Sequence, residues 1–122
     1  MKILVIEDDT FLSSLISSEL QGAGYEVLAA HDGTQGLEMA KEKPDLIMLD
    51  LVMPGMDGFE TLAALKADPA TASIPVVVAS NLGEAEEIKR AKDAGAIDFL
   101  VKVHFTPAEI IAKIRSLLPG VH

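Results

Sequence analysis

The 122-residue chain contains no cysteine, which excludes disulfide bonds, thiolate chemistry and cysteine-ligated zinc sites. Basic residues are also scarce, since 10 Lys and Arg stand against 19 Asp and Glu for a formal net charge of -9. Such a surface repels phosphate backbones and anionic lipids, so we expect no direct binding to nucleic acid. No apolar run approaches the length that spans a bilayer, and the N-terminus turns acidic too early for a signal peptide. We therefore expect a cytoplasmic protein without membrane insertion.

The length and the apolar pattern predict one domain over residues 1–122, with no output domain. Short runs rich in β-branched and aliphatic residues alternate with segments of helical spacing. The predicted strands cover residues 3–6, 26–30, 46–49, 74–79 and 97–101. The run at 26–30 mixes polar and apolar residues, which places it nearest a sheet edge.

Helical spacing fills the gaps between these strands. The first predicted helix has Thr10 as a candidate N-cap and Phe11 in its apolar stripe, and the second covers residues 35–43. The other three helices carry their apolar stripes on Phe59, Leu62 and Leu65, on Ile88, Ala91 and Ala94, and on Ile110, Ile111, Ile114, Leu117 and Leu118. Five strand–helix repeats predict a parallel sheet with helices on both faces, whose functional groups lie at the carboxyl ends of the strands.

Polar residues follow four of the predicted strands. The first strand ends in an acidic triplet at 7–9, and the third, fourth and fifth end in Asp50, Ser80 and Lys102. Taken singly, such residues are most often helix caps or solvated side chains. Together, crowded carboxylates repel one another unless a cation lies between them, and an oxygen-only ligand set suits a hard ion such as Mg²⁺. An Asp in this setting can attack phosphorus while the metal and a Lys neutralise charge.

The sequence Ile-Glu-Asp-Asp at 6–9, the sequence MLDLVMPGMDG at 48–58, Ser80 and Lys102 resemble the receiver domain of bacterial two-component response regulators, of the single-domain chemotaxis type. The resemblance covers essentially the whole chain. It implies a flavodoxin-like, doubly wound five-stranded parallel sheet of order 2-1-3-4-5 with five helices, the order that the chemotaxis member of the family exemplifies. It also implies a phosphorylation-dependent signalling switch rather than a turnover enzyme. A sensor histidine kinase or a phosphotransfer protein would donate the phosphoryl group, and a downstream protein would read the result.

The resemblance further implies which residues bind metal and phosphate. Asp50 would be the phosphoacceptor. Asp9 and Asp50 would bind Mg²⁺ directly, Asp8 would bind it through water, and the backbone carbonyl of Val52 would complete the protein ligands.

Three further residues acquire roles in the same way. Lys102 would pair with the phosphoryl oxygens, and Ser80 would move when the phosphoryl group arrives. Phe99 would be the aromatic switch that turns inward as Ser80 moves. The output surface would then lie on the fourth helix, fifth strand and fifth helix.

The chain departs from the family pattern at two places. The family usually has Pro directly after the Lys, commonly on a cis bond, but here Val103 follows Lys102 and the loop is about one residue longer. A cis bond before a non-proline residue costs roughly 2.5–4 kcal/mol, so we predict a trans peptide. Val52 and Leu82, which flank the phosphate in the family, are both apolar and cannot orient a hydrolytic water. The phosphorylated form should therefore decay slowly.

Four other functions share parts of this pattern. A magnesium-dependent phosphatase of the haloacid dehalogenase type also uses an Asp after a strand, but its second Asp, the acid/base, is replaced here by Val52. A flavodoxin-like electron carrier would need hydroxyl groups where residues 7–9 are acidic, and a dinucleotide site would need a G-x-G-x-x-G loop. A receiver that only scaffolds is disfavoured because the acidic residues, Ser80 and Lys102 are all present.

Overall fold

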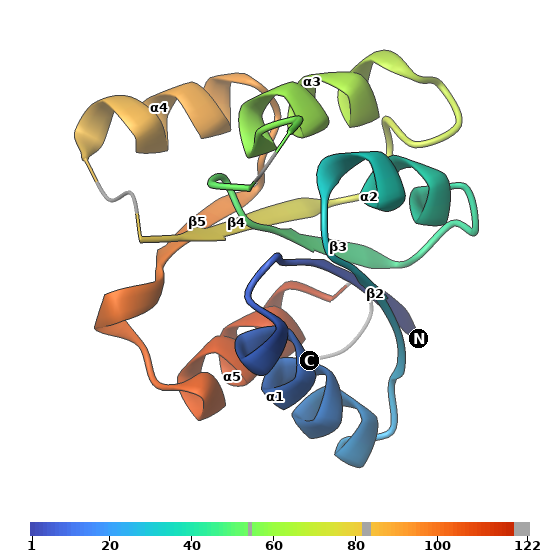
Figure 1. Ribbon diagram of the computed structural model, residues 1–122, viewed down its shortest axis with the longest axis vertical. Helices are drawn as coiled ribbons and strands as arrows, with labels where there is room; N and C mark the ends of the chain where they lie inside the picture. Colours follow the sequence, from blue (N-terminus) through green and yellow to red (C-terminus); the bar gives the residue numbers. More distant parts are fainter. Residues whose placement is uncertain (54, 82–83, 119–122) are drawn as a thin grey trace.

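The structure is a computed structural model, and it describes residues 1–53, 55–81 and 84–118. This part of the chain forms one five-stranded parallel sheet of order β2-β1-β3-β4-β5, which confirms the predicted order (Figure 1). The strands are β1 (Lys2–Ile6), β2 (Glu26–Ala30), β3 (Leu46–Leu49), β4 (Val76–Ser80) and β5 (Asp98–Val101). As predicted, β2 lies at an edge of the sheet.

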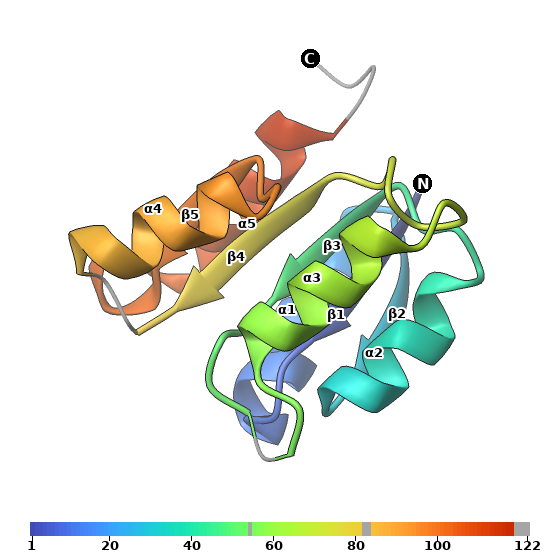
Figure 2. The same cartoon turned by 90° about the horizontal axis from the view of Figure 1, so that it is seen from above.

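Helices cover both faces of the sheet. They are α1 (Thr10–Gly22), α2 (Gly33–Ala40), α3 (Gly58–Ala67), α4 (Ala85–Asp93) and α5 (Pro107–Leu117), with a short 3₁₀ helix η1 (Lys102–His104) before α5. One face carries α2, α3 and α4, and the other carries α1 and α5 (Figures 1 and 2). No described helix is long and apolar enough to cross a membrane.

Two hydrophobic cores lie on the two faces because successive strand residues point in opposite directions. In β1, Leu4 and Ile6 pack on the side of α2, α3 and α4, whereas Ile3 and Val5 pack on the side of α1 and α5. These strand residues are fully buried. The central strands are therefore continuous apolar runs, and polar side chains appear only where the strands end.

Several predicted boundaries need correction. Strands β4 and β5 begin at Val76 and Asp98, later than the predicted residues 74 and 97, because the strand pairing starts there. Helix α2 begins two residues before residue 35, where the Asp32 side chain accepts a hydrogen bond from the Gln35 amide, and it ends at Ala40 rather than residue 43.

The start of α1 also differs from the prediction. Asp9, not Thr10, is the N-cap, since its side chain accepts a hydrogen bond from the Leu12 amide. Phe11 does not belong to the buried stripe, because the residue is 79% exposed. The inward face of the helix begins at Leu12, which packs against the core, and continues through the buried residues Ser13, Ile16 and Leu20.

Candidate functional site

The carboxyl ends of β1, β3, β4 and β5 surround an acidic cavity of about 270 Å³. Its lining consists of Glu7, Asp8, Asp9, Asp50, Val52, Ser80, Asn81 and Lys102. Parallel pairing places these strand ends at the same edge of the sheet, which is where such folds bind ligands. The structure therefore brings together all the predicted site residues except Phe99.

Asp50 lies at the centre of this edge, directly after β3. Its amide donates a 2.9 Å hydrogen bond to the carbonyl of Ile6, and only 4% of the residue is exposed. The loop after β3 folds back over it, because Gly58 at the start of α3 donates a 2.9 Å hydrogen bond to the Leu51 carbonyl. A Cβ at Gly58 would lie 2.3 Å from the Asp50 carbonyl oxygen, so only glycine permits this close approach.

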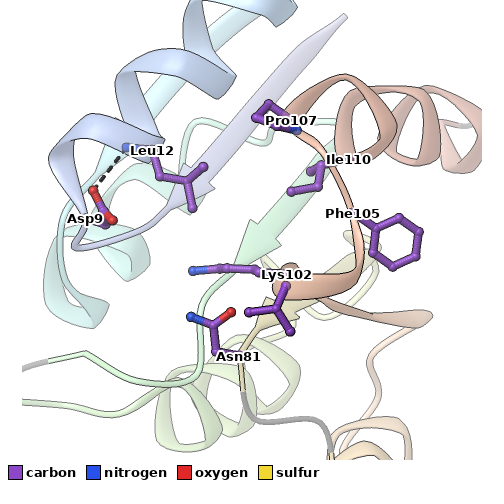
Figure 3. A pocket seen from close by; sticks show the side chains of 8 residues that line it. Asp9, Leu12, Asn81, Lys102, Phe105, Pro107 and Ile110 are labelled. Carbon is purple, nitrogen blue, oxygen red and sulfur yellow. Dashed lines mark hydrogen bonds between the residues drawn. The ribbon is translucent and has the colours of Figure 1, made fainter.

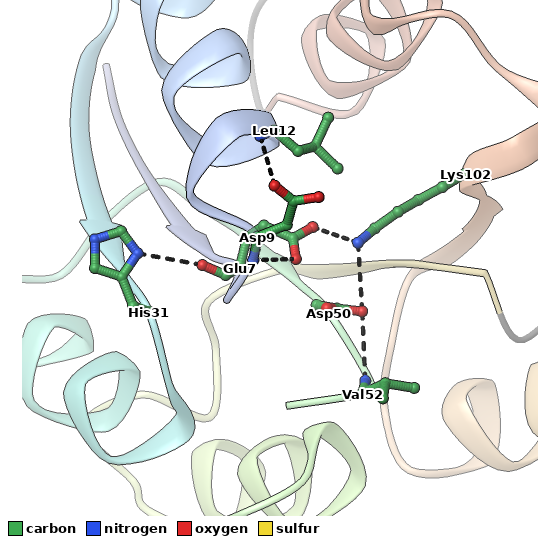
Figure 4. Close-up of polar contacts among 7 residues, drawn as sticks. All are labelled: Glu7, Asp9, Leu12, His31, Asp50, Val52 and Lys102. Carbon is green, nitrogen blue, oxygen red and sulfur yellow. Dashed lines mark hydrogen bonds and ion pairs between the residues drawn. The ribbon is translucent and has the colours of Figure 1, made fainter. Parts of the chain in front are cut away.

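Lys102 reaches into the cavity from the opposite side. Its ammonium group forms an ion pair with the Glu7 carboxylate and lies 3.4 Å from Asp50 Oδ1 (Figure 4). Lys102 is the first residue of η1, and its peptide bond to Val103 is trans, which confirms the prediction. Lys102, which Val103 follows in place of a proline, thus contacts two buried carboxylates.

The Asp50 carboxyl has a pKa that is raised from 3.8 to about 7. Burial is the largest cause, and hydrogen bonding to Glu7 and repulsion from its charge add to the effect. The Lys102 ammonium and the Val52 amide, which donates a 3.4 Å hydrogen bond to Oδ1, oppose it. The Asp50 carboxyl is therefore partly protonated near neutral pH, and a cation that enters the cavity would favour its ionised form.

Three carboxylates converge closely enough to hold a metal ion. Oxygen atoms of Glu7, Asp8 and Asp50 all lie within 4.8 Å of one another. The set is entirely oxygen and strongly acidic, so it fits a hard divalent cation. This cluster could hold a metal ion, and it contains Glu7 in addition to the predicted residues Asp8 and Asp50.

The predicted ligand Asp9 is replaced in this cluster by Glu7. Asp9 Oδ1 instead accepts a 3.1 Å hydrogen bond from the Leu12 amide and caps α1, at the rim of the cavity (Figure 4). The sequence held one signal for Glu7, which directly follows the apolar run at 3–6 just as Asp50 directly follows the run at 46–49. The register that pairs Ile6 with Leu49, and so places Glu7 beside Asp50, came only from the structure.

Sequence reasoning also gave no role to His31, at the end of β2. Its Nδ1 lies 3.3 Å from the backbone carbonyl of Glu7, and its amide donates a 2.9 Å hydrogen bond to Gln35. His31 therefore links the start of α2 to the loop that carries the acidic residues.

The two predicted switch residues lie on neighbouring strands. Ser80 is fully buried at the end of β4, where it pairs with Val101 of β5. Phe99 is half-buried and packs against the core beneath α2, α3 and α4. It lies outside the acidic cavity, two residues before Val101 along β5.

Comparison with known proteins gives the family. Residues 3–115 match the family described as Response regulator receiver domain. The chain is 43% identical over 118 residues to the DNA-binding dual master transcriptional regulator RpaA of Synechocystis, covering 96% of this chain and 48% of that protein. It is 36% identical over 121 residues to the transcriptional regulatory protein CpxR of Escherichia coli, covering 99% of this chain and 50% of that protein. The chain thus spans about half the length of the curated relatives that it matches.

Solved structures agree in fold. The chemotaxis protein CheY4 of Vibrio cholerae has a TM-score of 0.88 at 31% identity, with 96% of this chain and 98% of that chain covered. The Mn(2+)-bound form of response regulator Rcp1 has a TM-score of 0.86 at 26% identity, with 99% and 96% covered. Receiver domains bind a divalent metal in an acidic pocket, and histidine kinases phosphorylate them. With its parallel sheet and acidic edge, this chain belongs to the receiver-domain family of two-component response regulators, which are phosphorylation-dependent switches and not turnover enzymes.

Proposed function

We propose that Asp50 of this chain accepts a phosphoryl group from a histidine kinase or a phosphotransfer protein. The observation that carries the proposal is the placement of its buried carboxylate, 3.4 Å from the Lys102 ammonium and within the convergent acidic cluster. A nucleophilic carboxylate needs nearby positive charge when it attacks a phosphoryl group, and this site provides a lysine and a place for a cation.

Mg²⁺ is the ion that we assign to this cluster. Asp8 and Asp50 would hold it together with the backbone carbonyl of Val52, and Glu7, which also pairs with Lys102, would hold it through water. When bound, the ion would neutralise charge on the phosphoryl oxygens. The all-oxygen donor set and the crowding of the carboxylates support this assignment.

The residues of the chain itself would then change partners. Lys102 would leave Glu7 to pair with the phosphoryl oxygens, and Ser80 would donate a hydrogen bond to another of them. Because Ser80 and Phe99 lie on adjacent strands, movement of Ser80 would alter the space into which Phe99 turns. Phosphate would thereby stabilise one of two packings, and a partner would read the difference.

We further propose that α4, β5 and α5 form the surface that a downstream protein contacts, in the cytoplasm. The excess of acidic residues supports protein contact over direct contact of this segment with nucleic acid. RpaA is named as a DNA-binding regulator, and this chain matches only about half of it. Any DNA binding by a longer protein would therefore be expected outside the segment described here.

Intact mass spectrometry tests the proposal. The protein is incubated with phosphoimidazole and MgCl₂, beside the Asp50→Asn variant and a sample with EDTA. We expect one added phosphoryl group in the wild type, strongly reduced by EDTA and absent from the variant. A folded protein that takes up no phosphoryl group from any donor would contradict the proposal, as would rapid multiple turnover of the donor.

A further inference from the structure

The turn at residues 7–9 carries acidic residues of the site, and it is anchored at both of its ends. At the far end, Asp9 Oδ1 accepts a 3.1 Å hydrogen bond from the Leu12 amide, beside a second cavity of about 240 Å³ that Lys102 also lines (Figure 3). At the near end, the Glu7 amide donates a 3.0 Å hydrogen bond to the last carbonyl of β2. The backbone between these two anchors decides where the carboxylates of the turn lie.

Parallel pairing of β1 with β2 ends at this turn. The last register pair is Ile6 and Ala30, and parallel geometry would next offer the amide of Asp32 to the Glu7 carbonyl. Asp32 instead caps α2, where its side chain accepts a 2.7 Å hydrogen bond from the Gln35 amide. The Glu7 carbonyl thus lies one step past the ladder and needs a donor from elsewhere.

The imidazole of His31 supplies that donor. Its Nδ1 lies 3.3 Å from the Glu7 carbonyl oxygen (Figure 4). A carbonyl oxygen can only accept, so Nδ1 must carry the proton that it donates. The backbone of His31 is itself fixed, because its amide donates a 2.9 Å hydrogen bond to Gln35 Oε1 in the first turn of α2. Both backbone polar groups of Glu7 are thus bound from the end of β2, which sets the plane of the peptide between Glu7 and Asp8.

We propose that His31 is a positioning residue for the metal site: its Nδ1–H holds the peptide that joins Glu7 to Asp8, and thereby holds both carboxylates in the geometry that binds a divalent cation. The inference rests on the metal site proposed above for Glu7, Asp8 and Asp50, whose carboxylate oxygens lie within 4.8 Å of one another. These carboxylates repel one another before a cation arrives, so the backbone must hold them together. Hydrogen-bond partners of metal ligands raise affinity in this way, because they remove other orientations of the ligand.

The place of His31 predicts which step it affects. Its ring contacts the backbone of the acidic turn, and the ring nitrogen that faces this turn carries a proton, so it is not a metal ligand. Loss of the ring should therefore weaken cation binding and leave the attack by Asp50 unchanged once the metal site is full. This separation distinguishes positioning from a general loss of fold.

Three variants test the role by metal binding alone. His31→Leu removes the donor at similar size, and His31→Asn places an amide N–H close to the position of Nδ1, since both nitrogens are bonded to Cγ. Asp32→Ala is the matched control, because it removes the neighbouring cap of α2 without removing the ring. Mn²⁺ is titrated into each unphosphorylated protein, and the free ion is measured by electron paramagnetic resonance.

We expect His31→Leu to raise the Kd for Mn²⁺ about fivefold, less than is typical for a direct partner of a ligand because His31 acts through the backbone. His31→Asn and Asp32→Ala should each raise it less than about twofold. An unchanged Kd in His31→Leu would overturn the proposal, as would an asparagine variant or a cap variant that binds as weakly as His31→Leu. A wild type that binds no Mn²⁺ would contradict the proposed metal site itself, whereas binding that ignores His31 contradicts only this inference.

Phosphorylation kinetics give a readout that a merely structural role would not produce. The rate with phosphoimidazole is measured by intact mass over a range of MgCl₂ concentrations. In His31→Leu the half-saturating MgCl₂ concentration should rise about fivefold, while the rate at saturating MgCl₂ should change less than about twofold. A lower saturating rate with an unchanged half-saturating concentration would overturn the positioning role.

The ring of His31 also reports its own hydrogen bond. In a neutral imidazole the protonated and unprotonated nitrogens have different ¹⁵N chemical shifts, and the hydrogen bond made by one nitrogen sets the tautomer. At pH 8.5 we expect His31 to carry its proton on Nδ1, whereas the exposed His104 serves as the reference and should favour Nε2. A proton on Nε2 of His31 would overturn the proposal, because Nδ1 could not then donate.

Discussion

Replacing Asp50 by Asn should stabilise the metal-free protein, and the gain should depend on pH. The pKa of the Asp50 carboxyl is raised from 3.8 to about 7, mainly by burial and then by Glu7. A carboxyl with a raised pKa in the folded state contributes stability below its unfolded pKa and loses that contribution as pH rises through its folded pKa. The wild type should therefore lose stability between about pH 4 and pH 7, whereas the isosteric amide cannot ionise.

The magnitude follows from the size of the pKa change. A change from 3.8 to about 7 is about three pKa units, and each unit corresponds to about 1.4 kcal/mol. As an upper limit, Asp50→Asn should raise the free energy of unfolding by about 2 kcal/mol at pH 5.5 and about 4 kcal/mol at pH 8. Near pH 4 the difference should fall below about 1 kcal/mol, because Asp50 is then neutral in the folded state and only partly ionised in the unfolded state.

Urea denaturation followed by far-UV circular dichroism, in EDTA at pH 4, 5.5, 7 and 8, measures this difference. Asp93→Asn is the control, since it also removes one carboxylate but from an exposed ion pair on α4. This control should change the free energy of unfolding by less than about 1 kcal/mol at every pH. Adding MgCl₂ at about 100 times its Kd should stabilise the wild type by about 2.7 kcal/mol and Asp50→Asn by less.

A stability difference between Asp50→Asn and wild type that stays constant from pH 4 to pH 8 would refute this reasoning. A variant that is less stable than wild type at pH 8 would also refute it, because this result would show that the buried Asp50 charge does not destabilise the wild type. Equal stabilisation of both proteins by MgCl₂ would remove Asp50 from the metal site.

Three more outcomes follow from the structure. Gly58→Ala should lower the free energy of unfolding in urea by about 1–3 kcal/mol and slow phosphorylation, since the added Cβ would meet the Asp50 carbonyl. If the variant is as stable as the wild type, the loop can move away and the reasoning is wrong. Asp9→Ala should cost about 1 kcal/mol through loss of the α1 cap, whereas Asp9→Asn should cost less than half of that, and equal losses would contradict the capping role. Val52→Asn should shorten the lifetime of the phosphorylated protein, measured by mass after donor removal, because an amide can orient water where the exposed valine cannot; an unchanged lifetime would count against an apolar block. Leu82, which the sequence analysis paired with Val52 as an apolar neighbour of the phosphate, lies outside the described residues.

Sequence periodicity was sufficient for the architecture. The apolar runs of β1, β3 and β4 need cover on both faces, which dictates a parallel sheet between two helix layers. The boundaries were less well determined, because caps depend on side-chain hydrogen bonds. The helical spacing indicated Thr10 as the cap of α1, and only the structure shows that Asp9 accepts the hydrogen bond from the Leu12 amide.

The site divides in the same way. The residue types at the strand ends determined that carboxylates, a hydroxyl and an ammonium meet at one edge, because parallel strands end together. Tertiary structure decided which acid does what: strand register sets Glu7 beside Asp50, while the turn into α1 carries Asp9 away to cap the helix. It alone also formed the cavity behind Lys102, whose walls come from segments about 90 residues apart. The local sequence pattern determines the chemical group that each residue carries. Which of these groups converge depends on the pairing of strands that are distant in the sequence, and a one-dimensional pattern does not contain that information.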